Sequence, residues 1–97
     1  MLTREEAKKI ALDAIRASTV DPALDLVILD EFTRTKPYGW VFLCNTRKYS
    51  ETRNLLDGVG GNGPIIVEHN KRIHRLGSAQ APDDAVAELE AKRGWRP

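Results

Sequence analysis

The chain of 97 residues has room for one domain, with about one sheet and a pair of helices, and is too short for a second domain. Its content of 41% hydrophobic and 30% charged residues is typical of a soluble globular protein. A net charge of +1 gives no basis for electrostatic capture of nucleic acid or of an acidic membrane surface.

The start of the chain and its cysteine content indicate a cytoplasmic protein. Met1 and Leu2 are followed at once by the polar residues 3–6, so we expect no signal peptide. No apolar run approaches the roughly 20 residues that a membrane-spanning helix needs. Cys44 is the single cysteine, which excludes an internal disulfide and favours a reducing compartment.

The first predicted element is a helix over residues 4–17. Thr3 and Glu6 fit a capping box, in which each side chain accepts a hydrogen bond from the other residue's amide. Apolar residues recur at helical spacing, so one stripe of small side chains is expected to lie against a sheet. This stripe consists of Ala7, Ile10, Ala11, Ala14 and Ile15. The charged residues, Lys8 and Arg16 among them, are expected to face water.

Residues 24–46 predict an antiparallel hairpin. Residues 24–33 alternate apolar side chains as one strand, with Phe32 among the expected core aromatics, and residues 36–39 have turn composition. The uncharged stretch that follows is apolar on both faces, which is typical of the central strand of a sheet. Its side chains divide into Trp40, Phe42 and Cys44 on one face and Val41 and Leu43 on the other.

Residues 47–63 are predicted to form an irregular loop. They are polar and rich in glycine, apart from Leu55 and Leu56, which we expect to form a single helical turn that plugs one end of the core. A connection of this length in so small a domain is often functional or mobile.

A second hairpin is predicted over residues 64–77 and a helix over residues 82–93, with Pro82 at its first position. Trp95 beyond this helix either folds back on the core or belongs to a contact surface. The sequence therefore predicts an α+β fold, in which a four-stranded antiparallel sheet of two hairpins carries an N-terminal and a C-terminal helix.

The glycines of the loop satisfy a nucleotide-binding spacing by chance. Gly58, Gly60 and Gly63 match G-x-G-x-x-G, but a dinucleotide site needs a helix directly after the motif. Here Pro64 and a predicted strand follow, so a flexible loop is the better interpretation.

No residue set indicates catalysis or metal binding. His69 and His74 lack metal-ligand partners at a recognised spacing. We expect His69 to be a solvated turn residue and His74 to be a half-buried strand residue. Cys44 lies in mid-strand without a neighbouring base and is expected to be a small core residue. We therefore predict no catalytic residue, no metal site and no cofactor.

A basic cluster in the loop suggests a binding surface. Arg47, Lys48 and Arg53 lie near Tyr49, but nucleic-acid binding by stacking usually needs several exposed aromatic residues beside the charge. We therefore expect no nucleic-acid partner, and the residues alone indicate a small binding module.

An ordered set of short motifs between residues 39 and 90 resembles the YrhB-like proteins, grouped as the immunity protein 35 family of bacterial polymorphic toxin systems. The motifs are Gly39-Trp40-Val41-Phe42, Tyr49-x-Glu51-Thr52, Gly61-Asn62-Gly63-Pro64-Ile65-Ile66-Val67 and Ile73-His74-x-Leu76-Gly77-Ser78-Ala79 before Pro82. The chain departs from the family pattern by one extra residue before Pro82, and by Ala85 and Val86 where members often carry a larger side chain.

The resemblance implies a bacterial protein that is not an enzyme and that neutralises a cognate toxin by protein–protein contact. We expect the protein to be a monomer or homodimer. A chaperone-like protein that binds unfolded clients is the alternative. The length and polarity of the loop predict its contact residues, which are Arg47, Tyr49, Glu51 and Arg53.

Overall fold

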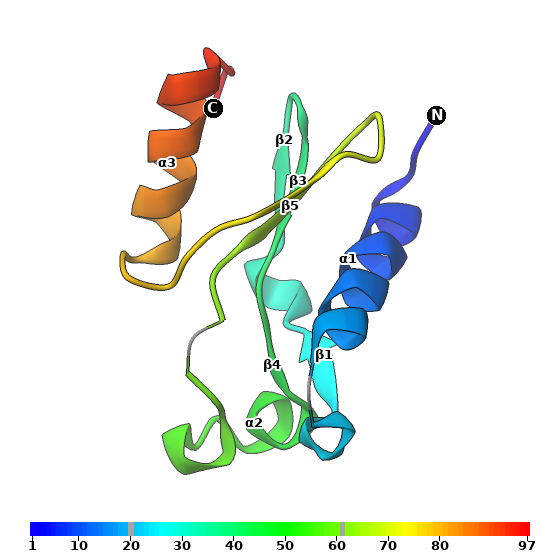
Figure 1. Cartoon of the computed structure of the whole chain (residues 1–97), viewed down its shortest axis with the longest axis vertical. Coiled ribbons are helices and arrows are strands. Elements are labelled where there is room, and N and C mark those ends of the chain that lie inside the picture. The colour runs from blue at the N-terminus through cyan, green and yellow to red at the C-terminus, as the bar shows by residue number, and fades with distance from the viewer. Residues whose placement is uncertain (20, 61) are drawn as a thin grey trace.

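The computed structural model of the protein describes residues 1–19, 21–60 and 62–97. Its longer helices lie on opposite sides of an antiparallel sheet, which gives three layers (Figure 1). The helices are α1 (Arg4–Ser18), α2 (Arg47–Thr52) and α3 (Pro82–Arg93), with short 3-10 helices η1 (Pro22–Leu24), η2 (Asp30–Phe32) and η3 (Leu55–Asp57). The strands are β1 (Leu26–Ile28), β2 (Arg34–Lys36), β3 (Gly39–Phe42), β4 (Cys44–Thr46), β5 (Ile65–Glu68) and β6 (Ile73–Arg75).

The predicted fold class is confirmed. The main sheet has four antiparallel strands in the order β2-β3-β5-β6, so β3 and β5 lie at its centre and each belongs to a different hairpin. A separate two-stranded sheet of β1 and β4, which the sequence did not predict, extends from one end of the main sheet.

The first hairpin is bent into two sheets, and this corrects the single strand predicted over residues 24–33. One arm is interrupted by residues 29–33, which include η2, whereas the other is interrupted by Leu43 alone. Because the interruption is five residues long in one arm and one residue long in the other, it acts as a large bulge. Bulges bend a paired strand. The backbone amide of Leu29 donates to the carbonyl of Leu43 at 2.8 Å, which joins the two arms at the bend.

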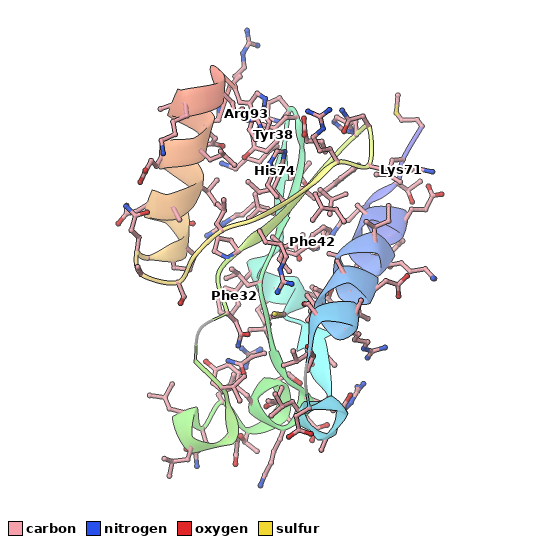
Figure 2. All side chains as sticks on the ribbon, viewed as in Figure 1. Phe32, Tyr38, Phe42, Lys71, His74 and Arg93 are labelled. Atoms are coloured by element: carbon pink, nitrogen blue, oxygen red, sulfur yellow. The ribbon has the colours of Figure 1, made fainter. Side chains whose placement is uncertain are left out.

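Two apolar cores cover the two faces of the main sheet. Trp40, Phe42 and Cys44 lie in the core on the α1 side, whereas Val41 packs with Ile66 on the α3 side, as the predicted alternation requires. Figure 2 shows Phe42 between the sheet and α1. The capping box at the start of α1 is also confirmed, because the Thr3 amide donates to Glu6 Oε1 at 2.9 Å and the Glu6 amide to Thr3 Oγ1 at 3.2 Å.

Gly39 lets β3 lie close to β5. Its φ of +154° is a conformation that L side chains rarely adopt, and a Cβ atom there would overlap the carbonyl oxygen of Val67. The turn residue therefore also sets the separation of the two central strands.

The chain after α3 folds back on the sheet, which decides between the two interpretations of Trp95. The Trp95 ring stacks on Tyr38 with a centroid distance of 4.3 Å and meets the edge of His74 at 5.4 Å. Beside it the buried carboxylate of Glu90 accepts from the Tyr38 hydroxyl at 2.8 Å and pairs with Lys36 at 3.2 Å. Burial and this carboxylate raise the pKa of Tyr38.

Candidate functional site

The segment predicted as an irregular loop begins with the helix α2. Thr46 caps its N-terminus by accepting from the Tyr49 amide at 3.0 Å, and Arg53 ends it in the left-handed conformation with φ 58°. The helix has six residues, none of them buried, and its two capping residues fix where it begins and ends. Because it has no apolar face, no apolar periodicity in the sequence indicated it.

The four predicted contact residues lie together on α2 and at its C-terminus, but on two sides. Arg47 and Glu51 are one helical turn apart, as are Tyr49 and Arg53. Glu51 and both arginines are exposed, whereas Tyr49 is half-buried. A Cβ atom at Gly58 would lie 3.2 Å from Tyr49 Cδ2, so the tyrosine also supports the fold of the following segment.

Both arginines are held by carboxylates from the first hairpin. Arg47 Nε donates to Asp25 Oδ2 at 2.8 Å, and Arg53 pairs with Glu31 while its guanidinium lies 5.6 Å from the centroid of the Tyr49 ring. Hydrogen bonds from the guanidinium groups lower the pKa of Asp25 and of Glu31 below their ordinary values. The predicted site is thus tied to residues 25–31.

The exposed pair Leu55 and Leu56, here called the leucine pair, contradicts the prediction of a plug in the core. The two residues begin η3 and are 82% and 90% exposed. Asn54 caps this turn by accepting from the Leu56 amide at 3.0 Å. Phe32 is also 41% exposed, so the prediction that it belongs to the core is wrong. Apolar character did not imply burial here, because η3 lies at the far end of the molecule from the main sheet (Figure 1).

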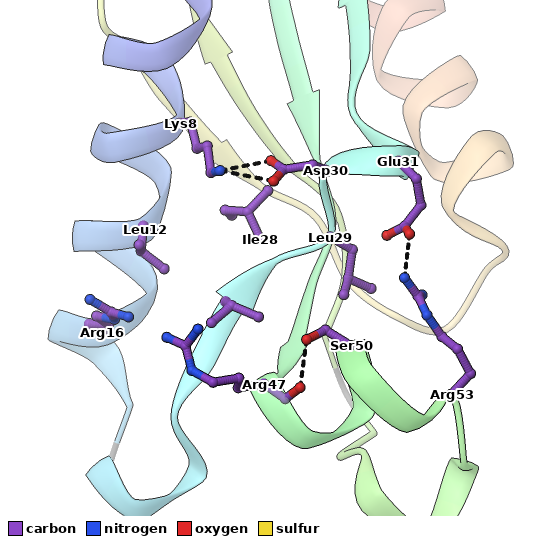
Figure 3. A pocket seen from close by; sticks show the side chains of 11 residues that line it. Lys8, Leu12, Arg16, Ile28, Leu29, Asp30, Glu31, Arg47, Ser50 and Arg53 are labelled. Atoms are coloured by element: carbon purple, nitrogen blue, oxygen red, sulfur yellow. Dashed lines mark hydrogen bonds and ion pairs between the residues drawn. The ribbon is translucent and has the colours of Figure 1, made fainter.

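A charged groove of about 440 Å³ runs between α1 and α2 (Figure 3). Its apolar residues include Leu12 and Val27, both half-buried, together with the buried Ile28 and Leu29. The remaining lining residues are charged or polar and come from α1, from η2 and from the α2 segment: Lys8, Arg16, Asp30, Glu31, Arg47, Ser50 and Arg53. Lys8 pairs across it with Asp30 at 2.8 Å.

Sequence reasoning missed the α1 side of this groove. Lys8 and Arg16 carry no signal beyond their charge, and such residues usually only face water. Lys8 and Asp30 are 22 positions apart in the chain, so only the fold brings them together. The same separation holds for the pairs of Arg47 and Arg53 with their carboxylates.

The other sequence candidates occupy structural places. His69 lies in the turn after β5 and is exposed, and His74 is half-buried and contacts Glu68 at 2.7 Å. Cys44 is buried, and burial raises the pKa of its thiol, which disfavours the nucleophilic thiolate. Within residues 1–19, 21–60 and 62–97, no group of three or more His, Cys, Asp or Glu residues is placed to hold a metal ion.

The glycine-rich stretch does not lead into a helix. Gly63 is followed by Pro64 and strand β5, and Gly61 lies outside the described residues. The side chain of Asn45 holds the start of this stretch, because its Oδ1 accepts from the Val59 amide at 2.9 Å. The arrangement favours a connecting loop over a phosphate site.

Acidification is expected to loosen α2 and η3 before the main sheet. The lowered pKa values of Asp25 and Glu31 mean that their ionised forms favour the folded segment. Their contribution to the stability of the segment is complete above the pKa values of the unfolded chain, which are about 4. It is lost as the pH falls through the lower pKa values of the folded state. Amide hydrogen exchange should therefore accelerate at residues 47–57 relative to β5 on moving from pH 6 to pH 3, after correction for intrinsic rates.

The double variant Asp25→Asn/Glu31→Gln is the control for this pH effect. It removes two of the carboxylates that favour the folded segment, so its α2 segment should exchange faster already at pH 6 and respond less to acidification than the original protein. The response that remains belongs to Asp57, because a hydrogen bond from Thr52 lowers the pKa of that carboxyl. Parallel exchange of residues 47–57 and β5 at every pH in the original protein would contradict the prediction.

No helix in the part of the chain that the structure describes is long and apolar enough to cross a membrane. The comparison with curated proteins found no match, nor did the comparison with solved structures. The family model described as Immunity protein 35 matches residues 5–96 and so covers α1, the main sheet, the groove and α3. The chain belongs to the immunity protein 35 family.

Proposed function

We propose that the protein binds a cognate bacterial toxin and neutralises it by protein–protein contact, with α2 and η3 as the contact surface. The family membership supports an immunity role. The observation that carries the choice of surface is the leucine pair, which leaves two neighbouring large apolar side chains more than four-fifths exposed. Burial of such side chains is a main source of free energy in protein association.

The residues around the leucine pair suit an interface. Tyr49 and Arg53 are types that dominate the binding energy of protein interfaces, and Arg53 is already positioned by Glu31 and by the ring of Phe32 at 5.7 Å. A side chain that is ordered before binding loses less conformational entropy when the complex forms. Arg47 and Glu51, on the other side of α2, would form the polar rim of the contact.

In this proposal the whole chain acts as one domain in the bacterial cytoplasm. Neutralisation needs only that the bound protein covers or distorts the toxin's working surface, so no reaction, cofactor or nucleic acid takes part. The protein binds as a monomer or homodimer, and one neighbouring gene supplies the toxin.

The test replaces the leucine pair and measures toxin binding. Calorimetry with the toxin domain encoded beside the gene should show at least about 100-fold weaker binding for Leu55→Asp/Leu56→Asp, because each buried leucine contributes about 1.5–3 kcal/mol and 1.4 kcal/mol is tenfold. Thermal unfolding should be nearly unchanged, because both side chains are exposed. The matched control is Ala87→Asp/Ala91→Asp, which adds the same charge to exposed positions of α3.

Two results would contradict the proposal. One is equal affinity of the leucine variant and the α3 control, and the other is unchanged affinity after joint replacement of Arg47, Tyr49, Glu51 and Arg53 by alanine in a folded protein. A chaperone role makes a different prediction, because the protein would then suppress thermal aggregation of many unrelated clients and bind each of them weakly.

A further inference from the structure

Strand β6 forms one edge of the main sheet and turns the backbone groups of two residues outward. In an antiparallel pair, residues alternate between those that bond to the neighbouring strand and those whose amide and carbonyl point away from it. The amide of Leu76, just after β6, donates to the carbonyl of Pro64 at 2.9 Å, so Leu76 faces β5. By the alternation His74 also faces β5, whereas Ile73 and Arg75 direct their amides and carbonyls to the free edge.

The opposite edge, formed by β2, offers fewer such groups. The carbonyl of Tyr38 accepts from the amide of His69 at 3.1 Å, so Tyr38 faces β5 and the next residue, Gly39, faces β2. Gly39 lies opposite Lys36, which therefore faces β3, and the neighbouring Thr35 points outward. Because β2 is three residues long and Thr35 is its middle residue, this edge has one outward residue where β6 has two.

The side chains beside the β6 edge include an exposed apolar one. Ile73 lies opposite Val67, which belongs to the core on the α1 side, so Ile73 is on that face of the sheet. It is 37% exposed and is the one large apolar side chain classed as exposed within the described strands. Figure 1 is viewed onto this edge: β6 passes in front of the other strands of the main sheet, between α1 and α3.

We propose that β6 receives an extended strand of the toxin, which adds to the main sheet as a fifth strand. Strand addition rests on the proposed function, because the toxin supplies the strand, and it is a second contact besides α2 and η3. Outward amides and carbonyls select an extended backbone, since Ile73 and Arg75 each offer it one donor and one acceptor. The residue opposite Ile73 is expected to be apolar, because cross-strand neighbours on one face contact each other.

The charge of the β6 edge disfavours a second copy of the chain as the occupant. Residues 71–75 carry three basic side chains and no acidic one. Of the carboxylates near them, Glu68 contacts His74 and Glu6 belongs to the capping box of α1. Antiparallel pairing of two such segments would bring the basic residues of both copies to one seam, and lysine or arginine on an edge strand opposes this self-pairing. A toxin strand without an excess of basic residues does not meet that repulsion.

Amide hydrogen exchange, followed by NMR, tests the backbone pairing directly. In the free protein, the amides of Ile73 and Arg75 should exchange fast and that of His74 slowly, because only His74 is bonded to β5. In the complex with the toxin domain encoded beside the gene, exchange at Ile73 and Arg75 should slow by at least about tenfold. Exchange at Thr35, on the opposite edge, should stay unchanged.

Proline variants separate the backbone from the side chain. Arg75→Pro removes an outward amide and no bond to β5, and an edge strand tolerates proline at such a position. It should bind the toxin domain at least about tenfold more weakly, because strand addition then loses a hydrogen bond and the close approach that goes with it. Arg75→Gln keeps the amide, and Thr35→Pro makes the same change on the opposite edge, so both controls should retain the original affinity.

The possible results separate strand addition from the proposed function. A toxin complex in which Ile73 and Arg75 exchange as fast as in the free protein would overturn strand addition and leave the leucine pair as the contact. This measurement needs no variant, so it decides the matter even if Arg75→Pro does not fold. Equal losses of affinity for Arg75→Pro and Arg75→Gln would assign the effect to the side chain and overturn strand addition as well.

Two further results concern the occupant. Slow exchange at Ile73 and Arg75 that appears without toxin as the protein concentration rises would identify a second copy and overturn the choice of the toxin. Absence of any toxin complex would overturn the proposed function, and with it the strand addition that rests on it.

Discussion

Replacing Gly39 by alanine is expected to destabilise the protein by about 4 kcal/mol or more, which places it among the most damaging single substitutions. The alanine would need a φ near +154°, and its Cβ would overlap the Val67 carbonyl oxygen in the neighbouring strand. To relieve that overlap, β3 and β5 would have to separate, and they are the two central strands of the main sheet. Urea or thermal unfolding followed by circular dichroism measures the loss.

Gly60→Ala is the matched control, because a Cβ atom there has no neighbour within 4 Å. Its free energy of unfolding should change by less than about 1 kcal/mol. Similar losses for Gly39→Ala and Gly60→Ala would mean that the close approach of β3 to β5 does not determine the stability. If Gly39→Ala proves too unstable to purify while Gly60→Ala behaves normally, the prediction is met.

Truncating Phe42 to alanine is expected to cost about 3–5 kcal/mol. Phe42 is 0% exposed and packs in the core between the sheet and α1, where the small Ala7 and Ala11 bring the helix close. The vacated space cannot be filled by these short side chains, so the cavity remains. For a chain of about this length, the loss corresponds to a fall in Tm of roughly 12 °C or more.

Phe32→Ala is the control with the same change of side chain. Phe32 is 41% exposed, so its replacement should lower the free energy of unfolding by about 1 kcal/mol. This amount includes the lost contact with Arg53. Phe42→Leu keeps most of the volume and should cost less than about 1.5 kcal/mol, which keeps the test informative if Phe42→Ala does not fold. Equal effects of the two alanine variants would contradict the assignment of the core.

Strong local patterns predicted the main elements. Alternation from Trp40 to Phe42 indicated a central strand with a different core on each face, and the structure places Trp40 and Phe42 with α1 and Val41 with α3. The capping residues Thr3 and Glu6 indicated the start of α1. These features depend on neighbours within a few positions, so a sequence displays them directly.

The bend in the first hairpin and the site beside it had no comparable signal. The apolar alternation ends at Leu29, but the charged residues Asp30 and Glu31 do not by themselves distinguish a 3-10 turn from the exposed end of a strand. The interruption depends on the opposite arm having only Leu43 at that point. The ion pairs that hold Arg47 and Arg53 join residues 22 positions apart. Such pairs depend on how the two arms bend, and single-residue preferences carry no information on this.

The sequence by itself determined the α+β class, the two hairpins, the face of each central side chain and the resemblance to an immunity family. Those features follow from short-range periodicity, caps and turn composition. Only the tertiary structure decided that the leucine pair is exposed and that Arg16 and Arg47 face one groove. Exposure and charge balance depend on which distant segments cover a residue, and the folded chain as a whole sets both.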